Sequence, residues 1–297
     1  MLLMLLTLFS IATLTFFMMH AIPGSPFNSI RNVPPKVIAA IETKYRIKDP
    51  IPVQYVRYMG DLLRGDLGPS LKYQGMTVVD LIKTGLPSSA QLGLVSITLV
   101  VLVSVPLGIV AALKNNRWQD GISMAFATVG VTIPSYIMAT VLLYIFALNL
   151  RWVPSFGIER PRAFILPVLA LSAYSIAFIT RLMRSSLLDV MNQDYIRTAR
   201  SKGLPEVKVI WKHALRNAML PVVTVIGPLI AGLLTGSFAI ERIFAIPGAG
   251  KHFVDSIANR DYPTIMGVTM FYAALLVIMV FVVDMLYVII DPRIKIE

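Results

Sequence analysis

Six apolar runs, each about as long as a membrane-spanning helix, constrain this chain more than any other feature. A helix needs roughly 20 apolar residues to cross the hydrocarbon core of a bilayer. Charged residues make up 14% of the chain, against about 25% in soluble domains. The sequence therefore predicts one all-α, polytopic membrane domain over 1–297 with six transmembrane helices. The runs lie near residues 1–22, 89–113, 121–148, 164–182, 218–240 and 264–290.

Lysine and arginine are unequally distributed between the loops that connect these runs. The connection 114–120, the loop 181–217 and the C-terminal tail together carry 12 of them, whereas the loops 149–163 and 241–263 carry six. Positive residues accumulate in short cytoplasmic loops. We therefore predict that both termini are cytoplasmic and that the segment 23–88 is extracytoplasmic. This placement accounts for the net charge of +11 without a nucleic-acid partner.

The N-terminal part of the chain is divided into a first span and an outer segment. We expect 1–22 to be a retained span, because it lacks the charged start and the small-residue cleavage site of a signal peptide. The segment 23–88 is too poor in apolar residues for an independent core. It forms either a small cap on the outer ends of the spans or, given its Pro and Gly content, a mobile linker. The remaining 89–290 is predicted to form a five-span core.

Prolines and glycines interrupt several of the apolar runs. Prolines are tolerated in membrane helices where neighbours satisfy the freed carbonyl groups, and broken helices with nearby hydroxyls are typical of a lined pathway. Simple kinking for helix packing is the alternative at each proline. The pair Gly232 and Gly236 is a small-xxx-small pattern that predicts a close helix contact. The candidate pathway residues are Thr132, Pro134, Ser135, Tyr136, Ser172, Tyr174 and Ser175.

A basic, polar loop follows the fourth apolar run. Asp194 is in a position to cap a short helix and Gly203 to end it, and Pro205 favours the first turn of a second helix. A basic amphipathic helix is typical of a membrane surface. A tight two-helix turn between two spans indicates instead a loop that docks on a cytoplasmic partner. The second helix is predicted to carry an apolar stripe of Val207, Ile210, Trp211, Ala214 and Leu215.

The loop resembles the cytoplasmic motif of the permease subunits of binding-protein-dependent ABC importers. That motif has Glu-Ala-Ala, then glycine after three residues, and a closing Leu-Pro. Here Arg197-Thr198-Ala199 precedes Gly203, and Leu220-Pro221 closes the loop. Arginine in place of glutamate and the longer spacing are similar to the oligopeptide and dipeptide permeases, through "DYIRTARSKG" and "HALRNAMLPVVT". Further resemblance covers most of the chain, in "PGSPF", "DLGPS", "NNRWQD", "GSFAIERIFAIPGAG", "NRDYP" and "VDMLYVIIDPRIKIE".

This resemblance implies a type I ABC importer permease in a bacterial cell membrane, with a cytoplasmic coupling loop at 183–217. The chain itself would be no enzyme and bind no cofactor, because ATP and Mg²⁺ belong to partner ATPase subunits. The implied partners are a second homologous permease, two ATPase subunits and an extracytoplasmic peptide-binding protein. The implied ATPase-coupling residues are Asp194, Tyr195, Ile196, Arg197, Thr198, Ala199, Arg200, Lys202, Gly203 and Leu204.

The outer connection after the fifth span carries a misleading motif. Residues 245–252 are similar to a phosphate-binding loop, but Ala245 replaces its first glycine and His252 its Ser or Thr. The connection is apolar and contains glycine turns, so we predict that it closes the outer mouth of the pathway, with loop packing as an equal alternative. The candidate outer gate residues are Phe244, Pro247 and Gly248.

Asp284 is the one acidic residue inside an otherwise apolar run. Intramembrane carboxylates commonly serve a function. We predict that Asp284 pairs with Arg181 or Arg184, with a substrate or proton role as the alternative.

The function expected from these patterns is that of a permease subunit that forms half of a heterodimeric pore for short peptides. Nickel or glutathione import is the alternative within the same family. An ion-coupled secondary transporter is the alternative from another class. An ion relay needs several buried charges, and the spans offer few beyond Asp284.

Overall fold

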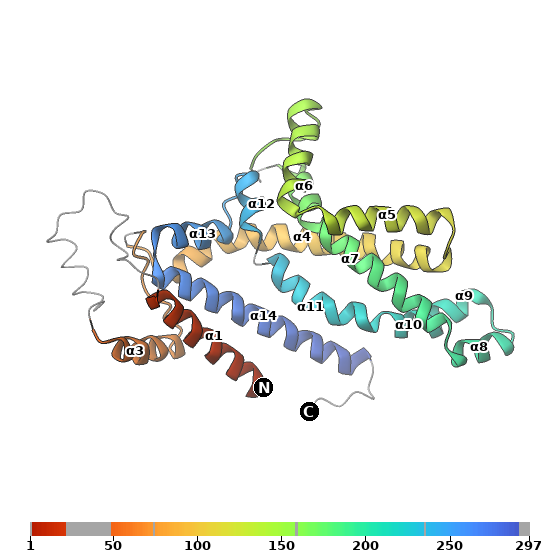
Figure 1. Ribbon diagram of the computed structural model, residues 1–297, viewed down its shortest axis with the longest axis horizontal. Coiled ribbons are helices and arrows are strands. Elements are labelled where there is room, and N and C mark those ends of the chain that lie inside the picture. Colours follow the sequence, from red (N-terminus) through yellow and green to blue (C-terminus); the bar gives the residue numbers. More distant parts are fainter. Residues whose placement is uncertain (1, 22–48, 74, 158–159, 235, 291–297) are drawn as a thin grey trace. The chain divides into compact units, whose positions relative to one another are not determined.

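The computed structural model describes residues 2–21, 49–73, 75–157, 160–234 and 236–290 (Figure 1). These residues are almost entirely helical; their one β-bridge joins Pro69 to Thr77. The chain divides into two compact units, the first built from 1–87 and 247–277 and the second from 88–246 and 278–297. The division falls inside two continuous helices, α4 (Val78–Leu113) and α14 (Tyr262–Ile290).

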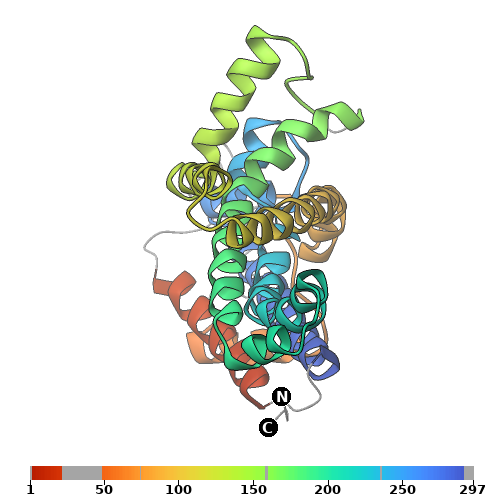
Figure 2. The same cartoon turned by 90° about the vertical axis from the view of Figure 1, so that its right-hand side faces the viewer.

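Five helices of the described chain are long and apolar enough to cross a membrane. A sixth span results when α5 (Trp118–Thr132) and the helix at Ser135–Asn149 are taken as one span bent by 106°. The latter consists of α6 (Ser135–Leu142) and η1 (Leu143–Asn149), which point away from α5 in both views (Figures 1 and 2). The prediction of an all-α polytopic membrane protein is confirmed. The five spans are Leu2–Ala21, Val78–Leu113, Pro161–Met191, Leu220–Ile243 and Tyr262–Val282.

Two helix boundaries differ from those expected. Helix α4 begins at Val78, so residues 78–88 are helical and continuous with the second predicted span. The reason is a reciprocal cap: the Thr77 amide donates to Asp80 Oδ2 at 2.9 Å, and the Asp80 amide donates to Thr77 Oγ1 at 3.1 Å. Helix α7 (Ile165–Met191) continues nine residues beyond 182. The stretch 183–191, predicted to belong to the coupling loop, is therefore helical and continuous with the fourth predicted span.

Close packing joins α4, α5 and α7 in the second unit. A Cβ at Gly108 of α4 would lie 2.6 Å from Met183 Cβ, and one at Gly130 of α5 would lie 2.8 Å from Ala177 Cβ of α7. The glycines therefore permit helix approaches that a side chain would prevent. Thr180 also donates a hydrogen bond to the carbonyl of Ser104 at 3.4 Å. These contacts make the three helices one packed body.

The fifth apolar run is divided into α11 (Leu220–Leu234) and α12 (Phe238–Ile243), with Gly236 at φ 77° between them. A Cβ at Gly232 would meet nothing within 4 Å, whereas one at Gly236 would lie 3.1 Å from the Ser89 hydroxyl oxygen of α4. A Cβ at Gly93 of α4 would lie 2.4 Å from the Leu233 carbonyl oxygen. Of the predicted pair, Gly236 therefore permits the close approach to α4, and Gly93 contributes to it from α4 itself.

The first unit contains α1 (Leu2–Ala21), α3 (Ile51–Leu63), α13 (Ala249–Asn259) and the beginnings of α4 and α14. The Thr13 and Tyr55 hydroxyls are 2.8 Å apart, and the Phe16 and Tyr58 rings stack with centroids 5.6 Å apart, which join α1 to α3. Leu67 packs against Val78 and Val268. The described residues 49–73 and 75–77 thus pack against helices of their own unit. Helix α13 was not expected from the sequence.

Candidate coupling site

A chain of short helices follows α7 (Figures 1 and 2). Gly203 has φ 74°, so it ends α8 in the left-handed conformation that the sequence predicted. Asp194 is not the cap: Gln193 occupies that position, and Asp194 is the first helical residue, 3.8 Å from Arg197. The helices are α8 (Asp194–Ser201), α9 (Glu206–Lys208), η3 (Val209–Ala214) and α10 (Leu215–Ala218).

Burial divides the ten predicted coupling residues into two groups. Ile196 is fully buried and Ala199 is 6% exposed, in a cluster that also contains Leu187 of α7. Their side chains hold α8 against the protein itself and cannot reach a partner's groove. Leu204 is half-buried against the same cluster. The exposed members are Asp194, Tyr195, Arg197, Thr198, Arg200, Lys202 and Gly203.

Arg200 is engaged within the loop. Its Nη2 donates to Glu206 Oε1 at 2.7 Å and its Nε to Oε2 at 3.2 Å, which joins α8 to α9 across the Gly203 turn. The hydrogen bond from Arg200 lowers the pKa of the Glu206 carboxyl below its ordinary value. Arg197 and Lys202 are exposed cations. The described ion pair of Arg197, with Asp194, is longer than the Arg200–Glu206 pair, at 3.8 Å. The two arginines therefore differ in role.

The apolar stripe predicted for the second loop helix is wrong in part. Residues 209–214 form a π-helix, whose wider turn shifts the faces set by a period of 3.6 residues. Val209 and Ala214 are fully buried, whereas Val207 and Trp211 are 68% and 65% exposed. The exposed side chains of Val207, Trp211 and Tyr195 add apolar area to the basic surface of the loop. The Tyr195 hydroxyl accepts a hydrogen bond from Asn217 at 2.7 Å.

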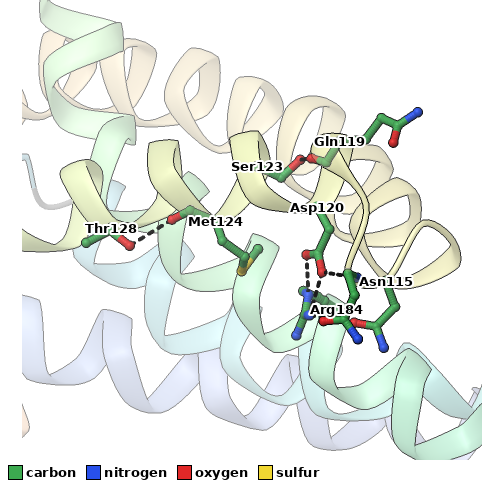
Figure 3. A network of polar contacts seen from close by, with 8 residues as sticks. Asn115, Gln119, Asp120, Ser123, Met124, Thr128 and Arg184 are labelled. Atoms are coloured by element: carbon green, nitrogen blue, oxygen red, sulfur yellow. Dashed lines mark hydrogen bonds and ion pairs between the residues drawn. The ribbon is translucent and has the colours of Figure 1, made fainter.

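Sequence reasoning missed a polar network at the end of α7 that leads into this loop (Figure 3). Asp120, at the start of α5, accepts hydrogen bonds from Arg184 Nε at 2.6 Å and from Arg184 Nη2 at 2.7 Å. The one signal for this pairing in the sequence is an acidic residue in the short 114–120 connection. Arg181 donates to Thr128 Oγ1 at 2.7 Å. The side chain of Asp284 lies outside the described structure, so its pairing with Arg181 or Arg184 stays a prediction.

The candidate pathway residues do not form one lining. Thr132, Pro134 and Tyr136 are exposed at the bend between α5 and α6, with Ser135 half-buried. Ser172 and Ser175 are buried on α7, where the Ser172 hydroxyl donates to the Ser96 carbonyl at 3.3 Å. The Ser172 hydroxyl therefore joins α7 to α4. Tyr174 is on the exposed face of α7 and stacks on Phe178 with centroids 6.2 Å apart.

The candidate outer gate residues have different environments. Phe244 is 1% exposed in an apolar cluster with Leu92 and Leu166 of the second unit, and its carbonyl accepts a hydrogen bond from Gly157. Pro247 is exposed, and Gly248 is the buried cap residue of α13 in the first unit. The packing of Phe244 supports the loop-packing alternative for that residue.

Sequence comparison decides the family. The family described as binding-protein-dependent transport system inner membrane component matches residues 104–296, and its N-terminal counterpart matches 1–74. This chain belongs to that family. It is a membrane permease subunit and not an enzyme.

Curated relatives match the permease over nearly its whole length. The dipeptide transport system permease protein DppB of Bacillus subtilis is 47% identical over 98% of this chain and 94% of its own. The oligopeptide transport system permease protein OppB of Salmonella typhimurium is 45% identical over 97% and 95%.

Two solved structures share the permease fold. An inward-facing MetNI methionine ABC transporter has a TM-score of 0.53 at 16% identity over 72% of this chain and 97% of that one. An amino acid ABC transporter crystallised with histidines has a TM-score of 0.51 at 18% identity over 73% and 95%. The type I importer fold is confirmed by these neighbours and by the family.

Proposed function

We propose that this permease forms one half of a heterodimeric pore for the ATP-driven uptake of short peptides. The observation that carries the substrate class is the identity of 44–47% with dipeptide and oligopeptide permeases over at least 97% of the chain. The other half of the pore is a second homologous permease. Two ATPase subunits that bind ATP and Mg²⁺, and an extracytoplasmic peptide-binding protein, complete the transporter.

The exposed face of α8 and the turn at Gly203 dock on an ATPase subunit. Three features support this role: the basic side chains of Arg197 and Lys202, the exposed apolar side chains of Val207 and Trp211, and the rigid seat that Ile196 provides for α8. A partly exposed ion pair contributes less than about 1 kcal/mol. Apolar contacts therefore supply most of the docking energy, and the cations orient the loop on the ATPase subunit.

The membrane orientation follows from the same loops. The 114–120 turn and the end of α7 are joined by Arg184 and Asp120, so they lie on the same side. Their excess of Lys and Arg places that side in the cytoplasm, together with α8 and both termini. The bilayer is the inner or plasma membrane of a bacterium.

Reconstitution in liposomes with the second permease, the two ATPase subunits and the peptide-binding protein tests the proposal. Uptake of a labelled dipeptide or tripeptide is measured with the binding protein on one side and ATP on the other. We expect uptake to require both ATP and the binding protein, and to survive collapse of the proton gradient.

Two results would contradict this function. Peptide transport by this chain alone, driven by a proton or sodium gradient, would identify a secondary transporter. Uptake of nickel or glutathione that excess peptide does not reduce would identify a different substrate class.

A further inference from the structure

The buried carboxylate of Asp120 is the centre of a polar network that joins α5 and the α4–α5 turn to α7 in the second unit (Figure 3). Its Oδ1 accepts from Arg184 Nε, and its Oδ2 accepts from Arg184 Nη2 and from the Asn116 amide at 2.9 Å. Arg184 Nη2 also donates to Asn115 Oδ1 at 2.8 Å. Asn116 has φ 60°, a costly conformation for a residue with a Cβ, and Asp120 holds it there. The α4–α5 turn is thus fixed to α7.

The network also lies next to the buried apolar cluster that holds the coupling helix α8 against α7. Met183, the neighbour of Arg184, belongs to the same buried cluster as Leu187 of α7 and Ile196 of α8. This cluster connects α8 to the last turns of α7 without interruption. A displacement of α8 therefore moves the end of α7 as one packed body, and Arg184 moves with it.

The opposite end of α5 is where the third span bends. Helix α5 begins beside Asp120 and ends at Thr132, before the bend of 106° at Pro134. A bidentate arginine–carboxylate pair fixes both distance and orientation. Asp120 is 4% exposed, so separation of the pair would leave a buried carboxylate without its arginine.

We propose that Asp120 and Arg184 are positioning residues that transmit movement of the coupling helix α8 to α5 and its bend. This inference rests on the proposed ATP-driven function. The pair contacts neither peptide nor ATP. Its role is to keep α5 in register with α7. When the ATPase moves α8 and the end of α7, α5 then moves with them and does not slide along α7.

The test measures peptides transported per ATP hydrolysed in the reconstituted complex, a ratio that does not depend on how much complex assembles. Asp120→Asn keeps the shape of the side chain and removes its charge. We expect the ratio to fall by at least about fivefold, the lower range of ordinary coupling effects. The matched control is Arg117→Gln, which removes one exposed charge from the same turn and leaves the pair intact; its ratio should equal that of the wild type.

A reversible link separates transmission from simple stabilisation. The chain has no cysteine, so Asp120→Cys combined with Arg184→Cys can be bridged in cysteine-free partner subunits by a short bis-methanethiosulfonate reagent, which forms a disulfide with each cysteine by displacing methanesulfinate and is cleaved by a reducing thiol. The bridged complex should couple, and cleavage of the bridge in the assembled complex should lower the ratio. This comparison also decides the matter should Asp120→Asn fail to assemble.

An unchanged ratio in Asp120→Asn, or in the assembled double variant after cleavage, would overturn the inference. A wild-type complex that takes up no peptide would contradict the proposed function instead. The two failures are therefore distinguishable.

Discussion

Ser70 donates a hydrogen bond to Asp261 across 191 residues of sequence. The amides of Leu71 and Lys72 donate to the same carboxylate at 3.1 and 3.2 Å, and the Thr264 amide at 3.3 Å. Asp261 thereby caps the first turn of α14 and fixes the loop before α4. Both Ser70 and Asp261 are nearly fully buried. One carboxylate thus satisfies donors from two distant parts of the first unit.

Replacing Asp261 should destabilise the protein. Asp261→Ala leaves two buried donors, the Ser70 hydroxyl and the Thr264 amide, without an acceptor, and each such group costs about 1–3 kcal/mol. We expect a loss of about 3 kcal/mol, seen as a lower melting temperature of the purified complex. The control Asp66→Ala removes an exposed carboxylate whose described bond is to the Gly68 amide, and it should cost less than about 1 kcal/mol. Equal melting temperatures for the two variants would contradict this account.

Gly203→Val should disrupt the coupling loop through its backbone alone. A Cβ at Gly203 meets nothing within 4 Å, but φ is 74°, which costs a residue with a Cβ roughly 1–2 kcal/mol. The variant should reach the membrane at wild-type level and retain less ATPase on purification. Gly60→Ala, in a helix where a Cβ also meets nothing, is the control. Normal peptide uptake by Gly203→Val would argue against the docking role of the turn.

Reversing the charge of Arg197 and of Arg200 should have different effects. Arg197→Glu changes an exposed charge and should weaken ATPase retention without altering the melting temperature. Arg200→Glu also breaks the pair with Glu206 and should lower both. Adding Glu206→Arg restores a pair of opposite sign, so it should recover the melting temperature but not the retention. Recovery of both would show that the loop needs only internal order, not its outward charge.

Cysteine labelling with an impermeant thiol reagent tests the orientation. Lys114→Cys and Ser201→Cys are exposed sites that should react only after the membrane is opened, whereas Lys72→Cys and Lys251→Cys should react in intact cells. Ser70 and Ala249 are 4% and 2% exposed. Cysteines at these two positions would not react with the reagent because they are buried, so they could not report the orientation. Labelling of Lys114→Cys in intact cells would reverse the proposed topology.

Local properties of the sequence determined the membrane class and the coupling turn. Span number depends on the length of each apolar run, and the turn depends on Gly203 being able to adopt a positive φ. Both are properties of short segments, so they could be predicted without knowledge of the fold. The family motif around Arg197 added the expected partners.

Only the tertiary structure decided which distant side chains meet and which faces are buried. Arg184 pairs with Asp120, and Ser70 with Asp261, because helix packing brings together residues 64 and 191 positions apart. The π-helix at 209–214 turned Trp211 outward, against the period that the sequence suggested. A bond between two helices depends on their angle, register and rotation together, and no local pattern in the chain encodes all three.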